Sequence, residues 1–68
     1  MLKRSLTISG HRTSVSLEDE FWLAFKEIAE KQKKPLAELV REIDQRRAGQ
    51  GLSSAIRIYV LNYYKTDG

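Results

Sequence analysis

Polar and apolar side chains alternate in the segment His-Arg-Thr-Ser-Val-Ser-Leu at residues 11–17. The polar members on one side of this alternation are Arg12, Ser14 and Ser16. Val15 and Leu17 fall on the other side, together with Thr13. Alternation with a period of two is typical of a strand that buries one face. Burial of the apolar face leaves a guanidinium group and two hydroxyl groups exposed to solvent, where they can form hydrogen bonds.

The formal net charge of +3 is concentrated near the N-terminus. Residues 1–17 contain Lys3, Arg4 and Arg12 and no acidic residue, whereas the remaining nine basic side chains are matched by nine acidic ones. A concentrated positive charge attracts phosphate and speeds encounter with nucleic acid. Three charges on a flexible tail would also increase solubility, so the charge alone leaves both interpretations open.

Groups suited to catalysis or metal binding are sparse. The sequence has no cysteine and a single histidine, His11, so neither a metal site nor a cofactor is predicted. Ser14 and Ser16 have only His11 as a nearby base, and the three acids at 18–20 are typical of a helix N-terminus. No glycine-rich phosphate-binding loop is present. The sequence therefore predicts that the protein is not an enzyme.

Three stretches after the strand have the apolar spacing of amphipathic helices. This spacing predicts a first helix over about 19–32 and a second over about 35–46, with Pro35 in its first turn. It also predicts a third helix over about 53–64, with Ser53 as its N-cap.

The N-terminal part of the chain is harder to assign. A second short alternation at 5–9 precedes Gly10 and is compatible with an extended strand, a second strand or an ordered arm. We expect residues 1–10 to form a basic N-terminal arm, residues 11–64 to form the folded domain, and residues 65–68 to form a tail.

A chain with one convincing strand must pair it with something, because a lone strand leaves both of its edges without hydrogen-bond partners. Antiparallel pairing with the same strand of a second copy, about a twofold axis, solves this problem. The expected fold class is therefore mainly α-helical with one short β-strand and a third helix. The expected assembly is an intertwined homodimer with an intermolecular antiparallel two-stranded ribbon. The side chains expected in the dimer core are Val15, Leu17, Phe21, Trp22, Phe25, Ile28, Leu39, Val40, Ile43, Ile56, Tyr59 and Val60.

The chain resembles ribbon–helix–helix DNA-binding proteins in Arg-Thr-Ser-Val-Ser-Leu at 12–17 and in Phe-Trp-Leu-Ala-Phe-Lys-Glu-Ile-Ala at 21–29. The longer segment 3–22, together with Leu-Ser-Ser-Ala-Ile-Arg at 52–57, resembles a small bacterial subfamily of that fold. The resemblance covers about residues 3–64.

The resemblance implies a dimer that lays its ribbon in the DNA major groove. Arg12, Ser14 and Ser16 would then contact base edges. Phosphate contacts are expected from Lys3, Arg4, His11, Lys33, Lys34, Ser53 and Ser54. A minimal member of the family has two helices, so the helix at 35–46 and the helix at 53–64 both qualify as its second helix. The phosphate clamp at a helix N-terminus accordingly involves either the two lysines or the two serines.

The predicted function is sequence-specific binding of double-stranded DNA by a homodimer that regulates transcription like a repressor. The alternative is a dimeric protein-interaction module of antitoxin type, in which the third helix or the loop at 46–51 binds another protein. No apolar run has the length of a signal peptide or a membrane span, so the membrane is not a predicted partner. The expected location is the cytoplasm.

Overall fold

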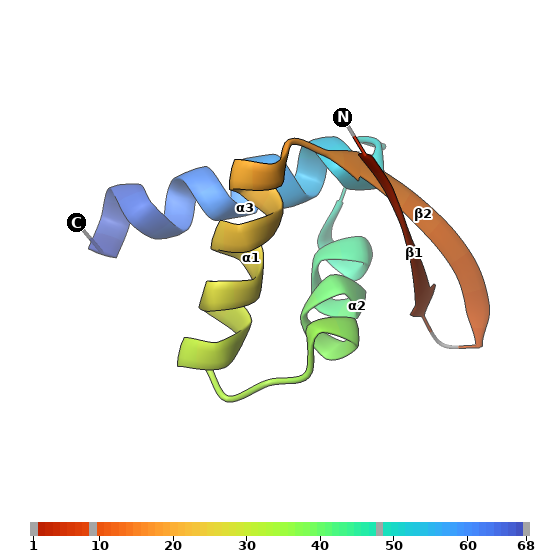
Figure 1. Cartoon of the computed structure of the whole chain (residues 1–68), viewed down its shortest axis with the longest axis horizontal. Helices are drawn as coiled ribbons and strands as arrows, with labels where there is room; N and C mark the ends of the chain where they lie inside the picture. Colours follow the sequence, from red (N-terminus) through yellow and green to blue (C-terminus); the bar gives the residue numbers. More distant parts are fainter. Residues whose placement is uncertain (1, 9, 48, 68) are drawn as a thin grey trace.

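The chain folds into a β-hairpin followed by three helices (Figure 1). The computed structural model describes residues 2–8, 10–47 and 49–67. Its elements are β1 (Leu2–Ile8), β2 (His11–Leu17), α1 (Asp19–Lys31), α2 (Leu36–Arg46) and α3 (Leu52–Asp67). The hairpin lies to one side of α2, which contacts β1, and α3 contacts α1, α2 and β2.

The strand β1 is the main departure from the sequence prediction. The prediction of a single strand is wrong, because Leu2–Ile8 pairs antiparallel with β2 in the same chain. Most of the expected arm at 1–10 is therefore a strand, while Met1 and Ser9 lie outside the described residues. Gly10 has a φ of 81° in the turn between the strands, a conformation that glycine adopts without steric cost. The physical reason for β1 is that the alternation at 5–9 continues a half-buried strand pattern that β2 can pair with locally.

The helices α1 and α2 lie within one residue of the predicted ranges 19–32 and 35–46. Pro35 is the N-cap of α2 and lies just before its first turn. Its backbone is extended, with φ −60° and ψ 146°, which suits the fixed φ of proline.

The helix α3 is longer than the predicted 53–64 at both ends. Ser53 lies inside its first turn, and its hydroxyl accepts a hydrogen bond from the backbone of β2, so it does not act as the predicted N-cap. The predicted tail at 65–68 is helical as far as its third residue, and Gly68 lies outside the described part. Thr66 supports this last turn, because its hydroxyl donates to the Asn62 carbonyl at 2.8 Å.

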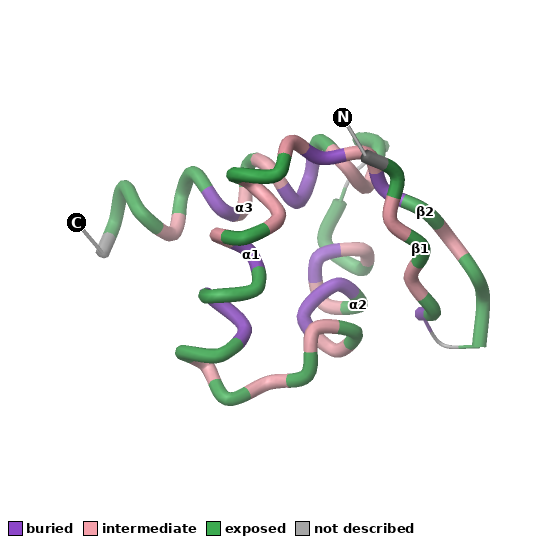
Figure 2. The backbone as a smooth tube through the Cα atoms, in the orientation of Figure 1, coloured by how far each residue is buried: buried purple, intermediate pink, exposed green. Residues whose placement is uncertain are grey.

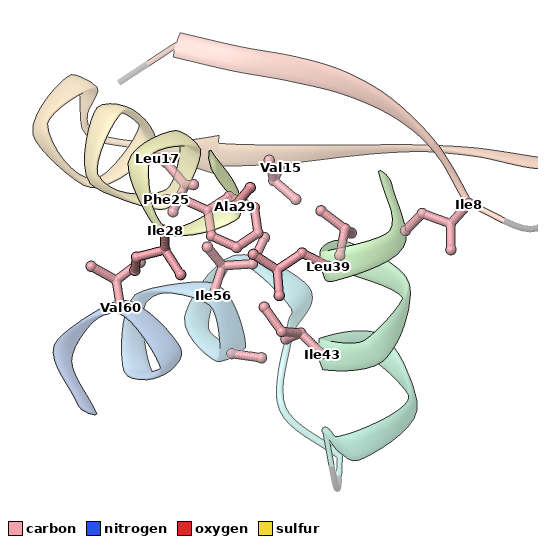
Figure 3. Close-up of a cluster of buried hydrophobic side chains, with 12 residues drawn as sticks. Ile8, Val15, Leu17, Phe25, Ile28, Ala29, Leu39, Ile43, Ile56 and Val60 are labelled. Carbon is pink, nitrogen blue, oxygen red and sulfur yellow. The ribbon is translucent and has the colours of Figure 1, made fainter. Parts of the chain in front are cut away.

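The hydrophobic core lies between the inner face of the hairpin and the three helices (Figure 3). Its buried members are Ile8, Val15, Leu17, Phe25, Ile28, Ala29, Leu39, Val40, Ile43, Ala55, Ile56 and Val60. Three predicted core residues, Phe21, Trp22 and Tyr59, are partly buried against this cluster, and the other predicted ones are buried. These contacts lie within one chain, and the sharing of the core between two copies stays a prediction.

Candidate nucleic-acid interface

The hairpin has an inner face toward the helices and an outer face toward solvent (Figure 2). Directly opposed residues of neighbouring strands project to the same face, so the register identifies the members of each face. The outer face consists of three cross-strand pairs: Lys3 with Ser16, Ser5 with Ser14, and Thr7 with Arg12. Ser16 is half-buried and the other five are exposed. None of these six side chains is acidic or apolar.

The outer face combines two cations with four hydroxyl groups. The Arg12 guanidinium can donate two parallel hydrogen bonds, as it does to guanine or to a phosphate. Hydroxyl groups both donate and accept, so they can pair with several base edges. A two-stranded ribbon also has dimensions that the major groove of B-DNA, about 12 Å wide, can admit. The arrangement can therefore form hydrogen bonds with base edges and phosphates together.

The structure places the three predicted base-contacting residues on this one face. It adds Lys3, which lies opposite Ser16, and it places Arg4 on the inner face. The Arg4 guanidinium carbon lies 4.7 Å from the centroid of the Trp22 ring, and its Nη2 lies 3.3 Å from Asp19 Oδ1. These contacts hold Arg4 against α1 and direct it away from the outer face.

The other predicted phosphate contacts are dispersed. Lys33 and Lys34 lie in the connection between α1 and α2, at the opposite end of these helices from the start of α3 (Figure 1). Lys33 is exposed, whereas the Lys34 Nζ lies 2.9 Å from Glu42 Oε2. This hydrogen bond raises the pKa of Lys34 and lowers the pKa of Glu42. Lys34 is therefore partly neutralised within the chain, which makes it a weaker candidate for a phosphate contact than Lys33.

His11 and the two serines lie nearer to the hairpin. His11 begins β2 and is exposed. Ser54 is exposed in the first turn of α3, which starts beside the end of β2 (Figure 1). Ser53 is half-buried, and its Oγ accepts a hydrogen bond from the Ser16 backbone N–H at 3.0 Å. The structure therefore brings together the predicted residues of β2, namely Arg12, Ser14 and Ser16. The Ser53 hydroxyl is already bonded to the backbone of β2.

Polar contacts from α3 fix the end of β2 where the outer face meets the helices. Arg57 Nη2 donates to the Ser16 carbonyl oxygen at 3.0 Å, and Arg57 Nε donates to Glu18 Oε1 at 3.0 Å. A hydrogen bond from its own backbone N–H, and then the one from Arg57, lower the pKa of Glu18. Arg57 thus links the end of β2, the start of α1 and the first turns of α3.

The comparisons with known proteins agree with this architecture. The chain matches the family model described as Ribbon-helix-helix domain over residues 1–64. This chain belongs to the ribbon–helix–helix family. The match extends through the hairpin, α1, α2 and most of α3, so it includes both helices that qualified as the family's second helix. No curated protein and no solved structure gives a significant match.

Ribbon–helix–helix domains generally bind DNA, as transcription regulators or antitoxins, and they form dimers. They are DNA-binding regulators and not enzymes. Within the described residues, no group of three His, Cys, Asp or Glu side chains is placed to hold a metal ion. No described helix is both long enough and apolar enough to cross a membrane.

Three residues of this ribbon–helix–helix chain were absent from the predicted interface. Ser5 and Thr7 join the outer face because β1 is a strand, and the alternation at 5–9 was the signal for it. Arg41 of α2 lines a hollow of about 450 Å³ together with Thr7, which brings a further cation beside β1. No local pattern in the sequence distinguishes Arg41 from the other exposed basic residues.

Proposed function

We propose that this ribbon–helix–helix protein is a homodimer that binds double-stranded DNA sequence-specifically and regulates transcription like a repressor. The outer face of the hairpin is its DNA-contacting surface. The observation that carries this proposal is the composition of that face, where cations and hydroxyl groups occur without any acidic or apolar side chain. Such a face is costly to cover with apolar protein surface but is well suited to phosphates and base edges.

In this proposal the two strands have different tasks. Arg12, Ser14 and Ser16 on β2 contact base edges, and Lys3 on β1 contacts a phosphate. Phosphate contacts position a protein on DNA, whereas base contacts determine which sequence it prefers. Arg4 has a structural task instead, because it is held between Trp22 and Asp19.

The homodimer is supported by the open edge of β2. The described sheet has the order β1-β2, so no strand of the described chain covers the other edge of β2. An uncovered edge presents unpaired N–H and C=O groups, and proteins usually cover such edges. A dimer also doubles the positive charge of the N-terminal hairpin, which strengthens attraction to DNA.

Selection of bound DNA from a random pool by the purified protein tests the proposal. We expect enrichment of a short inverted repeat, because a twofold-symmetric dimer contacts two equivalent half-sites. A control selection with Arg12→Ala should lose preference at one position of each half-site while the repeat spacing remains. Recovery of unenriched DNA by the folded wild-type protein would contradict sequence-specific binding.

An antitoxin-type interaction with another protein is the second candidate function. Exposed apolar side chains on α3 support it, since Ile58 is 44% exposed and Leu61 is 56% exposed. Large apolar side chains at a surface are found at many protein interfaces. If the protein binds only another protein, Arg12→Ala should leave the selection of DNA sequences unchanged. If it binds DNA, Arg12→Ala should alter the DNA sequence that is selected.

A further inference from the structure

We infer that Ser53 and Arg57 of α3 are positioning residues for base recognition, because they hold the backbone of Ser16 so that its hydroxyl meets one defined base edge. This inference rests on the DNA binding of the proposed function and deepens it. It gives α3 a part in sequence preference, although neither side chain belongs to the outer face of the hairpin.

The backbone of Ser16 is bonded on both sides by side chains of α3. Ser16 is the half-buried member of the outer face. Its N–H donates to Ser53 Oγ at 3.0 Å, and its carbonyl oxygen accepts from Arg57 Nη2 at 3.0 Å. In an antiparallel pair, alternate residues direct both backbone groups toward the neighbouring strand or away from it. Ser16 directs its groups to α3, so side chains of this helix hold its peptide groups in place of β1.

The Arg57 guanidinium is itself held by Glu18, the N-cap of α1. Arg57 Nε donates to Glu18 Oε1 at 3.0 Å, while its Nη2 donates to the Ser16 carbonyl oxygen. The side chains of Arg57 and Glu18 are 29% and 45% exposed, so water screens this ion pair only in part. A guanidinium group carries its donors in fixed directions, whereas a lysine ammonium is a compact charge on a flexible stem. Arg57 can therefore hold two acceptors in a defined geometry that lysine cannot reproduce.

The first turns of α3 are anchored in the hydrophobic core. Ala55 and Ile56, which lie between Ser53 and Arg57 in the sequence, are 7% and 0% exposed. Close packing leaves such a helix little freedom to shift. The two hydrogen bonds therefore tie the end of β2 to a rigid element. A binding site is accurate when a second layer of residues on rigid elements supports the residues that make contact.

Ser16 depends on this support more than Arg12 does. The serine hydroxyl is separated from the backbone by one rotatable side-chain bond, and a hydrogen bond weakens when the donor and acceptor lie more than about 3.2 Å apart. A small displacement of the backbone therefore breaks the contact of Ser16 with a base. Arg12 has a long side chain that can compensate, and it lies roughly 14 Å away along β2, at about 3.4 Å per residue. Loss of the contacts from α3 should therefore affect one base position and spare the position that Arg12 contacts.

Selection of bound DNA from a random pool by the full chain and its variants tests this role. Ser16→Ala identifies the position of each half-site that depends on the Ser16 hydroxyl. Arg57→Lys, which keeps the charge, and Ser53→Ala should each lower discrimination at that same position by about fivefold, which is roughly the effect of one lost hydrogen bond. Arg46→Lys is the matched control, because it makes the same side-chain change in the last turn of α2 and should select the wild-type sequence.

Ser53→Thr adds a test by rescue. It keeps the hydroxyl, so it should retain the preference that Ser53→Ala lowers, and circular dichroism confirms that each variant is folded. If Arg57→Lys does not fold, the two Ser53 variants decide the question.

A structural role alone predicts a different result. Folded variants would then bind all sequences more weakly with unchanged preference, and this outcome would overturn the positioning role while leaving the proposed function intact. Preference lost at a position other than the one that Ser16→Ala identifies would overturn it as well. If the folded wild type enriched no sequence, the proposed function would fail and the positioning role would fail with it.

Discussion

Replacement of Ile56 by alanine tests whether α3 is an integral part of the core. Ile56 is 0% exposed, and its side chain lies among the buried side chains of the cluster (Figure 3). Truncation of a buried isoleucine to alanine typically costs about 2–5 kcal/mol, because transfer free energy is lost and a cavity remains. A chain of this length is stabilised by roughly 3–10 kcal/mol in total, at about 0.05–0.15 kcal/mol per residue. We therefore expect Ile56→Ala to remove a large part of the free energy of unfolding.

Ile58 provides a matched control on the same helix, because it is 44% exposed. Ile58→Ala should change the free energy of unfolding by about 0.5 kcal/mol or less. Urea unfolding followed by far-ultraviolet circular dichroism measures both variants, and all samples should have one protein concentration because dimer stability depends on it. Equal losses for the two variants, or a larger loss for Ile58→Ala, would refute the placement of α3 described above.

Three further perturbations have defined outcomes. Truncation after Arg47 removes the buried Ile56 and Val60, so we expect cooperative urea unfolding to disappear; an unchanged midpoint would contradict this. Val15 is 1% exposed, so Val15→Asp should give no folded protein by circular dichroism, because a carboxylate would be buried among apolar side chains. The lowered pKa of Glu18 means that its contribution to stability is complete above pH 4.5 and is lost as the pH falls through the lower folded-state value. Glu18→Gln should therefore make the acid-induced loss of stability shallower, and an identical pH profile would show that Glu18 is not coupled to folding.

Local patterns in the sequence were sufficient to predict the helices and most of the core. The period of two identified β2. The helical spacing predicted both ends of α1 and α2 to within one residue, and it identified most of the buried residues of these helices. These features depend on near neighbours in the chain, which is why they are visible in the sequence. The division of β2 into an apolar and a polar face followed from the same pattern.

Contacts between distant residues could not be predicted in this way. Arg57 donates hydrogen bonds to Glu18 and Ser16, which precede it in the sequence by 39 and 41 positions. Nothing near Arg57 in the sequence indicates that its partners lie at the end of a strand. The strand β1 was missed for a different reason. The alternation at 5–9 is short and comes directly after Lys3 and Arg4. A basic arm explains this part of the sequence as well as a strand does, and only the pairing with β2 in the structure distinguishes the two.

We propose that the outer face of the hairpin contacts bases through β2 and phosphates through β1. Binding and salt titrations of Arg12→Ala and Lys3→Ala, on the selected site and on random DNA, test it most directly. Arg12→Ala should weaken binding to the selected site by roughly 1–3 kcal/mol for each bidentate pair that it removes and relax preference at one position of each half-site. Lys3→Ala should weaken binding about equally on both DNAs. It should also reduce the slope of the logarithm of the binding constant against the logarithm of the salt concentration by about one for each phosphate contact that is lost. If Arg12→Ala remained a folded dimer with unchanged affinity and sequence preference, the outer face would not be the DNA-contacting surface.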